Sequence, residues 1–420
     1  MNEERRSSVP RPSRRTMLGL LGAAPVAGSA LLQACGGTEP EPAGDEVAET
    51  ASASSVDLQS WRELRPGGAY GRLVAKLAAA DRFSGTVLLA YRGRPVLELA
   101  YGMADKARSI PNQMDTLFDV ASIGKTFTAV AIMQLAQQNE IAFDDTIGKF
   151  LDGFPAEVAG TVTVHQLLTH TSGIGEYAQF REYWEASKTW SSVEEVFEGT
   201  VNFIRGMPRQ PEFTPGTRWR YSNAGYQVLG AIVAAVSKEK NYYDYVRKHV
   251  FLPARMRRTD FYTKPQILAA DDVAHPYATD PVTGERVDST LTEMFPFVGT
   301  PAGGAHSTVR ELLNFVRALH EDGTLLEPAF AELATSGKMV VPAAFGPDLP
   351  RQNMFWAYGF EATTFNHRRI RGHSGGSTLG ASNMLSFYPD LNWVSVSLSN
   401  YPDRNAEMVN LERDLITRRR

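Results

Sequence analysis

The chain has 420 residues, of which 43% are hydrophobic and 21% charged, and its formal net charge is −4. This globular composition leaves room for one large domain or two smaller ones, and it carries no basic excess that would point to a nucleic-acid partner. Cys35 is the single cysteine of the chain, which excludes an intramolecular disulfide and a thiolate metal cluster.

Residues 1–34 predict an export signal. Five arginines precede an apolar run at residues 17–32, which glycine and proline interrupt and which is short for a membrane span. The stretch SRRTML at residues 13–18 resembles a twin-arginine signal. The stretch LQAC at residues 32–35 resembles a bacterial lipobox, in which Cys35 is lipidated and becomes the N-terminus. The alternative is a plain signal peptide with an incidental cysteine. The only cysteine closes the apolar run, which favours the lipobox and an exported, lipid-anchored protein.

Residues 35–56 predict an acidic flexible tether. They are rich in alanine, serine, glycine and proline and contain no aromatic residue, so they offer no core. The folded part is then expected at residues 57–420, where no segment is a candidate membrane span and no internal repeat is found. Contact with a membrane is therefore expected through the N-terminal lipid only.

The secondary structure of the folded part can be read in chain order. Two β-branched and aromatic runs around a glycine turn predict a hairpin of residues 83–89 and 96–101. Residues 126–133 (TFTAVAIM) are apolar almost all round, which predicts a buried helix. Further helices are expected at residues 162–168, 226–236, 242–251, 308–319 and 404–420, with a capping box of Thr308 and Glu311, and strands at residues 383–388 and 393–398.

Strands therefore lie at both ends of the folded part, and helices lie in the middle. This order predicts an α/β (α+β) fold, in which an antiparallel sheet built from both chain ends is flanked by helices and a mostly helical lobe is inserted. We expect the sheet lobe at about residues 57–120 and 300–420 and the helical lobe at about residues 121–299. A site is expected in the crevice between the two lobes.

Ser122 and Lys125 form the first candidate catalytic pair. Residues three apart on a helix share one face, and Ser122 opens the apolar helix, where the helix dipole favours negative charge. A buried lysine with a lowered pKa can take the serine proton. A second match, Ser237 with Lys240, lies in a charged stretch with no apolar helix after it, and we interpret it as surface.

Two further motifs add candidate residues. Tyr221 and Asn223 follow a Pro-Gly-Thr turn. A phenol can relay a proton to a leaving group, and an amide can orient both lysine and substrate. The HSGG run at residues 373–376 allows a close backbone, whose N–H could complete an oxyanion hole with the Ser122 N–H. The plainer interpretations are a tyrosine packed under a loop and a glycine-rich turn before a strand.

Together these motifs resemble the serine β-lactamase and penicillin-binding protein family, closest to its class C, D-Ala-D-Ala carboxypeptidase and esterase branch. The resemblance runs from about residue 83 to about residue 401 and includes TLF at 116–118, LLTHTSG at 167–173, PGT at 215–217 and GG at 303–304. It implies a β-lactamase/transpeptidase-like fold and a serine hydrolase that forms an acyl-enzyme. The implied roles are nucleophile for Ser122, base for Lys125, proton relay for Tyr221, and pocket residues for Asn223 and His373. The N–H groups of Ser122 and Gly376 form the implied oxyanion hole, with Gly375 among the substrate and oxyanion residues. His170 also matches a family phrase, and we interpret it as structural.

The chain departs from this pattern at the third motif. Members that act on β-lactams usually carry Lys-Thr-Gly or Lys-Ser-Gly there, whereas His373 takes the place of the lysine. The resemblance therefore implies an ester, amide or peptide substrate, either a small molecule or peptidoglycan-like, with no cofactor and no metal. The alternative is a cell-wall binder or β-lactam sensor on the same fold that acylates without turnover, since a fold does not decide function. The oligomeric state stays open.

The sequence argues against three other kinds of functional site. The GHSGG run at residues 372–376 fits the nucleophile elbow of α/β-hydrolases, but no histidine follows Ser374 as their chain order requires. The Gly-Lys-Thr run at residues 124–126 lacks the P-loop glycine five residues earlier, where Asp119 stands. No His-Glu-x-x-His sequence is present and the histidines are scattered, so no zinc site is expected.

Overall fold

The computed structural model describes residues 58–342, 353–403 and 406–418. The chain divides into two units between residues 53 and 54, and every described residue belongs to the second unit, Ser54–Arg420. The expected export signal, Cys35 and the tether lie outside the described residues. Within the described part of the chain, no helix has both the length and the apolar character needed to cross a bilayer.

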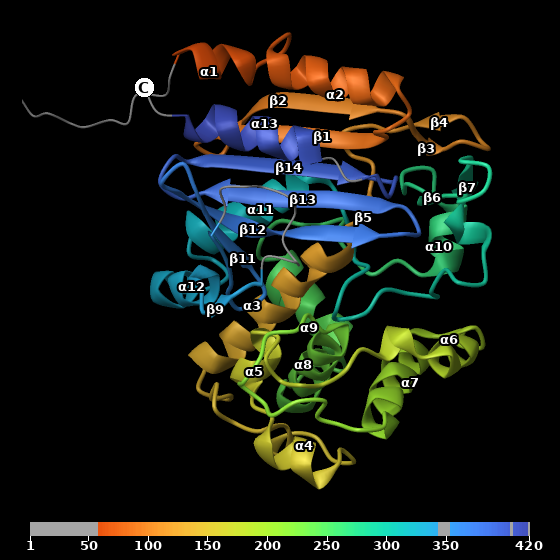
Figure 1. The fold of residues 1–420 in the computed structure, drawn as a ribbon, viewed down its shortest axis with the longest axis vertical. Coiled ribbons are helices and arrows are strands. Elements are labelled where there is room, and N and C mark those ends of the chain that lie inside the picture. Colours follow the sequence, from red (N-terminus) through yellow and green to blue (C-terminus); the bar gives the residue numbers. More distant parts are fainter. Residues whose placement is uncertain (1–57, 343–352, 404–405, 419–420) are drawn as a thin grey trace, which may run out of the picture. The chain divides into compact units, whose positions relative to one another are not determined.

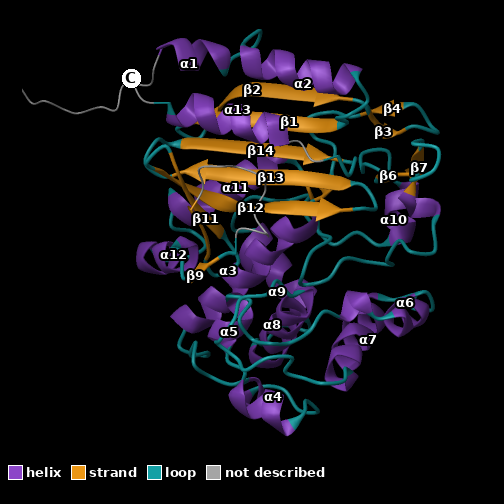
Figure 2. Ribbon diagram, in the orientation of Figure 1, coloured by secondary structure: helices purple, strands orange, loops and turns teal. Residues whose placement is uncertain are grey.

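An antiparallel sheet of eight strands forms the centre of the second unit (Figures 1 and 2). The strand order is β2-β1-β14-β13-β12-β11-β10-β9. Gly85 of β1 pairs with Ser399 of β14, so the early hairpin joins the last strand and the sheet predicted from both chain ends is confirmed. The strands are β1 (Gly85–Tyr91), β2 (Arg94–Tyr101), β9 (Met339–Val340), β10 (Asn353–Trp356), β11 (Glu361–Phe365), β12 (Arg368–Ser377), β13 (Ala381–Tyr388) and β14 (Trp393–Ser399).

Helices cover both faces of this sheet (Figure 2). Val87 and Leu89 of β1 belong to an apolar cluster with α2 and α13, whereas Leu88 and Ala90 belong to a cluster with α3 and α11. Because successive side chains of a strand point to opposite faces, both faces of β1 are buried, which explains its continuous apolar run. The helices of these layers are α1 (Leu58–Glu63), α2 (Ala69–Ala79), α3 (Gly124–Gln137), α11 (Val309–His320), α12 (Pro328–Thr335) and α13 (Ala406–Thr417).

The middle of the chain is mostly helical (Figure 1). Its helix α3 is the buried helix predicted from the apolar run, and every side chain from Gly124 to Met133 is buried. The Phe127 ring makes edge contacts with Phe251 and Phe315, which fixes the helix in the core. The remaining helices are α4 (Ala156–Thr161), α5 (Val164–Leu168), α6 (Arg181–Ser187), α7 (Val193–Gly206), α8 (Asn223–Val236), α9 (Tyr242–Val246) and α10 (Lys264–Ala269). Three short strand pairs complete the unit: β3 (Met103–Asp105) with β4 (Ile110–Pro111), β5 (Phe118–Asp119) with β8 (His306–Ser307), and β6 (Tyr277–Thr279) with β7 (Arg286–Asp288).

One detail of the predicted elements is wrong. Thr308 caps α11 by accepting the Glu311 N–H, but the Glu311 carboxylate accepts bonds from Thr259 and the Arg258 N–H instead of closing a capping box. A buried hydroxyl needs a partner, and Thr259 finds it in this carboxylate. The helix expected at residues 242–251 is present, and it consists of α9 followed by a π-helical turn, Arg247–Phe251.

Candidate active site

Ser122 lies in a short 3-10 turn, η1 (Ala121–Ile123), between β5 and α3. Ala121 directly before it has φ +47°, a left-handed conformation that costs energy in residues other than glycine. The Asp119 carboxylate accepts the Ala121 N–H at 2.7 Å and supports this turn. Backbone strain of this kind persists only where neighbouring contacts hold it, and it is common at functional sites.

A glycine from a distant part of the chain packs against this turn. A Cβ on Gly303 would lie 2.7 Å from the Ala121 carbonyl oxygen, and a Cβ on Gly124 would lie 3.1 Å from the Gly303 Cα. Glycine is therefore required for the backbones to approach this closely. The approach brings the carbonyl of Ala302 to the side chain of Lys125.

The side chain of Lys125 is fully buried beside Ser122. Its Nζ lies 3.1 Å from Ser122 Oγ and donates to Asn223 Oδ1 at 2.7 Å and to the Ala302 carbonyl at 2.5 Å. Burial lowers the pKa of Lys125 to about 7, against the opposing effect of the Glu176 charge. At neutral pH the amine is therefore in part uncharged and able to accept a proton.

Tyr221 is the second group in contact with the serine. Its Oη donates to Ser122 Oγ at 2.8 Å, and Lys125 Nζ lies 4.8 Å from its ring centroid. Burial raises the pKa of Tyr221 far above its usual value, so the phenol is protonated throughout the physiological range. Ser122 therefore has a potential base on one side and a protonated phenol on the other.

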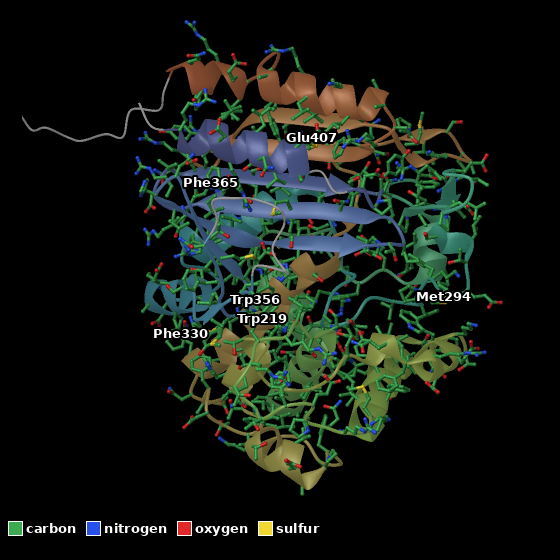
Figure 3. All side chains as sticks on the ribbon, in the orientation of Figure 1. Trp219, Met294, Phe330, Trp356, Phe365 and Glu407 are labelled. Carbon is green, nitrogen blue, oxygen red and sulfur yellow. The ribbon has the colours of Figure 1, made fainter. Side chains whose placement is uncertain are left out.

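His170 holds the loop that carries Tyr221. Its carbonyl accepts the Arg220 N–H, and its Nδ1 accepts the Ser222 N–H at 3.2 Å, on the two sides of Tyr221. The imidazole is packed among aromatic rings, including those of Trp219 and Trp356, which lie next to each other (Figure 3). These contacts agree with the structural role that we expected for His170.

The HSGG run lies in β12 and is not a turn. Strand β11 ends opposite Gly372, so residues 373–377 have no strand on that edge among the described residues. The Ser374 N–H points to this edge, where it donates to the Glu361 carboxylate at 3.0 Å. Because N–H directions alternate along a strand, the Gly376 N–H points to the same open edge.

Gly375 brings β12 against the turn of the serine. A Cβ at this position would overlap the Val120 carbonyl oxygen and would lie 3.4 Å from the Ile123 nitrogen. A Cβ on Gly376 would find only the Ala381 carbonyl oxygen, at 3.7 Å. The two glycines therefore differ. Gly375 permits the contact with η1, whereas the position of Gly376 has room for a methyl group.

The side chain of His373 is buried beside these groups. Its ring makes an edge contact with Trp356, and its Nδ1 donates to the Ser374 carbonyl at 2.5 Å. Burial lowers the pKa of His373 to about 4. The Lys125 charge acts in the same direction, and the Glu361 charge opposes both. The imidazole is therefore neutral at pH 7.

The structure thus brings together the predicted residues Ser122, Lys125, Tyr221, Asn223 and the HSGG run. It also adds residues that the sequence analysis missed, namely Asp119, Glu176, Ala302 and Glu361. Glu176 Oε2 accepts the Asn223 N–H at 2.7 Å. No local pattern marks Glu176, Ala302 and Glu361, because each acts through a partner that only the folded chain brings near, whereas Asp119 acts on the Ala121 N–H two residues along the chain.

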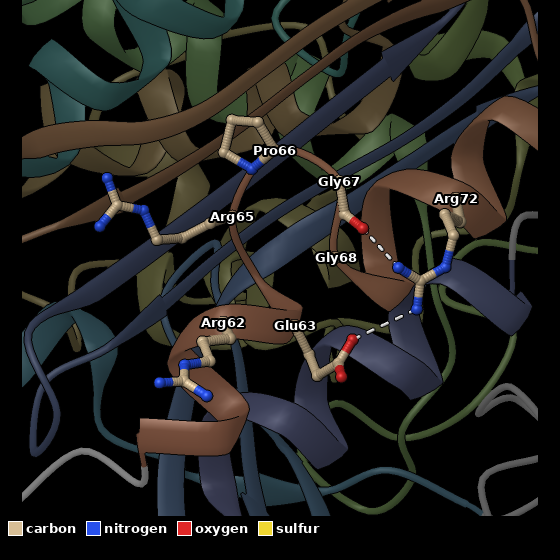
Figure 4. Close-up of a pocket in the computed structure, with 7 residues that line it drawn as sticks. All are labelled: Arg62, Glu63, Arg65, Pro66, Gly67, Gly68 and Arg72. Carbon is tan, nitrogen blue, oxygen red and sulfur yellow. Dashed lines mark hydrogen bonds and ion pairs between the residues drawn. The ribbon is translucent and has the colours of Figure 1, made fainter.

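A pocket of about 580 Å³ lies elsewhere, around the ends of α1 and α2 that face each other (Figure 4). Its lining contains three arginines, and one of them, Arg72, bonds to Glu63 and the Gly67 carbonyl. None of its lining residues belongs to the Ser122 site. Within the described residues, no group of three or more acidic, histidine or cysteine side chains is placed to hold a metal ion.

Comparison with known proteins places this geometry in a family. A family model for beta-lactamase matches residues 71–416. The chain belongs to the beta-lactamase family. This family member is 28% identical to penicillin-binding protein 4* of Bacillus subtilis over 340 residues, which covers 78% of this chain and 70% of the relative. It is 33% identical to esterase EstB of Burkholderia gladioli over 160 residues, 35% of this chain and 39% of the esterase.

Solved structures show the same relationship. The penicillin binding protein of Bacillus halodurans superposes with a TM-score of 0.69 at 25% identity, covering 80% of this chain and 97% of that one. The β-lactamase/transpeptidase-like fold predicted from the sequence is therefore confirmed. This beta-lactamase family member is a serine hydrolase.

Proposed function

We propose that this serine hydrolase forms an acyl-enzyme on Ser122 with an ester, amide or peptide substrate. The observation that supports it is the position of Ser122 Oγ, 3.1 Å from Lys125 Nζ and 2.8 Å from Tyr221 Oη. A lysine whose pKa is about 7 supplies a base at physiological pH. Near-neutral pKa values suit a catalytic base because proton transfer then needs little driving force.

In the proposed reaction, neutral Lys125 takes the hydroxyl proton as Ser122 Oγ attacks the carbonyl carbon. The carbonyl oxygen becomes an oxyanion that accepts hydrogen bonds from the N–H groups of Ser122 and Gly376. Tyr221 gives its proton to the leaving group as the bond to that group breaks, and the proton held by Lys125 restores the phenol. Water then attacks the acyl carbon, and its proton returns to Ser122 Oγ as the acid is released.

The remaining candidate residues have supporting roles in this proposal. Asn223 orients Lys125 through its amide oxygen, and Gly375 lets the strand approach the serine. His373 lines the pocket as a neutral group, which favours small uncharged esters and amides without a free carboxylate over substrates that need a cation at this place. One relative is named an esterase, which fits the ester substrates of this proposal.

The test is covalent labelling followed by a turnover assay. A serine-directed phosphonate should label the protein at Ser122, and Ser122→Ala should abolish the labelling. Mass-spectrometric mapping of the label to Ser374 or Ser237 would overturn the assignment. An acetate ester should then be hydrolysed over many turnovers, whereas a single burst would identify the alternative, a sensor that stays acylated.

We also propose export through residues 1–34 and a lipid anchor on Cys35, so that the enzyme acts outside the cytoplasm. The arginine pair at residues 14–15 and the position of the sole cysteine support this proposal. One acyl chain binds a membrane only marginally, so firm anchoring needs two or more. Mass spectrometry of the mature N-terminus tests it: diacylglyceryl-modified Cys35 is expected, and an unmodified internal Cys35 would refute it. Replacing Arg14 and Arg15 by lysine should trap the precursor in the cytoplasm.

A further inference from the structure

Glu361, the first residue of β11, accepts hydrogen bonds from Ser374 of the HSGG run, the third motif of the sequence analysis. Its Oε1 accepts the Ser374 N–H at 3.0 Å and the Ser374 hydroxyl at 2.5 Å. Ser374 holds the second position of the motif, where members that act on β-lactams carry the hydroxyl residue of Lys-Thr-Gly or Lys-Ser-Gly. Both donors of Ser374 are therefore committed to a carboxylate before any substrate arrives.

His373 offers an acceptor at the same place. A carbonyl oxygen only accepts, so the bond to the Ser374 carbonyl puts the ring hydrogen on Nδ1. In the neutral ring Nε2 then carries a lone pair. This atom has no hydrogen-bond partner among the described residues, although the residue is only 2% exposed. A buried, unpaired acceptor is stabilised by a donor and opposes a carboxylate.

A second carboxylate, that of Glu176, is also connected to the site. Glu176 is bonded to the backbone of Asn223, whose side chain holds Lys125. The charges of Glu361 and Glu176 both act on the buried phenol of Tyr221. Arg220, directly before Tyr221 in the chain, is ion paired with Glu212. Two carboxylates therefore act on the phenol that donates to the reacting hydroxyl.

We propose that the site selects acyl donors that carry an ammonium group, such as amides or esters of unblocked amino acids, and that Glu361 binds this group. The inference rests on the proposed acyl-enzyme function. Glu361 Oε2 has no hydrogen-bond partner within the described residues, so it can accept from an ammonium while Oε1 keeps Ser374. Hydrogen bonds between charged groups are about twice as strong as neutral ones.

The experiment compares three short-chain p-nitroanilides at pH 7.0. Glycyl p-nitroanilide carries an ammonium, propionyl p-nitroanilide is its neutral counterpart, and malonyl p-nitroanilide carries a carboxylate. We expect kcat/KM to fall in that order, by about tenfold from glycyl to propionyl. Glu361→Gln keeps an acceptor for Ser374, and it should lose about tenfold more kcat/KM on the glycyl compound than on the propionyl compound. Glu198→Gln, which removes an exposed charge on α7, should change neither rate.

The outcomes separate this inference from the proposed function. Equal rates on the three anilides, or an equal loss on all of them in Glu361→Gln, would overturn the inference while phosphonate labelling of Ser122 leaves the acyl-enzyme intact. If the protein is labelled but does not cleave anilides, protection of Ser122 by glycinamide, propionamide and malonamate gives the same comparison, with protection by glycinamide expected to be strongest. Absence of both labelling and cleavage would overturn the proposed function and the inference with it.

Discussion

The amide oxygen of Asn223 lies 2.7 Å from Lys125 Nζ and accepts one of its hydrogens. This bond orients the amine while burial lowers its pKa to about 7. Because the uncharged amine is the base, we expect kcat/KM for an acetate ester to rise as the pH increases through about 7 and then to level off. Lys125→Arg should be inactive at every pH, since a guanidinium stays charged in proteins. A profile that falls from pH 6 to pH 8 would contradict this role for Lys125.

The same contact predicts how the profile can be moved. Asn223→Asp puts a carboxylate against the amine with little change in shape, and a nearby opposite charge favours the charged lysine. The rising limb of the pH profile should therefore shift upward by one unit or more, on the order of the shifts caused by such neighbours. Glu198→Asp on the exposed face of α7 serves as the control and should leave the limb in place. If the rising limb of the pH profile does not shift in Asn223→Asp, that limb does not report the ionisation of Lys125.

Asp119 should position the nucleophile through the backbone. Its carboxylate accepts the Ala121 N–H at 2.7 Å, next to the strained residue before Ser122. We expect Asp119→Ala to lower kcat by about a hundredfold, because small displacements at a reacting group cost that much. Asp119→Asn retains an acceptor oxygen and should recover most of the rate. If both variants lose the same activity, a positioning role through this hydrogen bond is wrong.

Gly375 and Gly376 offer a matched pair for stability. A methyl group on Gly375 would overlap the Val120 carbonyl, whereas one on Gly376 would make only an ordinary contact with the Ala381 carbonyl oxygen, at 3.7 Å. Gly375→Ala should therefore lower the free energy of unfolding by about 1–3 kcal/mol, as overpacking does, and Gly376→Ala should change it little. Urea denaturation of both variants measures the difference. Equal destabilisation of the two variants would contradict the close contact of β12 with η1 at Gly375.

His373 should make substrate preference independent of pH. Since burial lowers its pKa to about 4, the ring stays neutral from pH 5.5 to 8.5, and the kcat/KM ratio of a cephalosporin to an acetate ester should stay constant and low. His373→Lys supplies a cation for the carboxylate and should raise this ratio by about tenfold. His367→Lys adds the same charge at an exposed turn and should leave the ratio unchanged. Efficient cephalosporin turnover by the wild type at pH 8 would contradict the prediction.

Local patterns in the sequence were sufficient to predict much of the fold and to pick out Ser122 and Lys125 as candidates. The apolar run of residues 126–133 identified the buried helix α3, and the β-branched runs around a glycine identified the β1–β2 hairpin. Ser122 and Lys125 were found because they lie on one helical turn, a spacing that is visible in the chain itself. The predicted capping box at Thr308 was wrong because the Glu311 carboxylate accepts a hydrogen bond from the buried Thr259 hydroxyl, which is distant in sequence.

The chemistry of these groups was decided by tertiary structure. Lys125 receives its partners from positions 98 and 177 residues away, and its pKa depends on burial that no local pattern encodes. Glu361 meets Ser374 only because β11 and β12 pair in one register, in which Glu361, the first residue of β11, lies opposite Gly372 of β12. The sequence by itself determined which residue types are present and which local elements they form. The folded chain determined protonation and charge at the site, because both depend on desolvation and on neighbours that come from other parts of the chain.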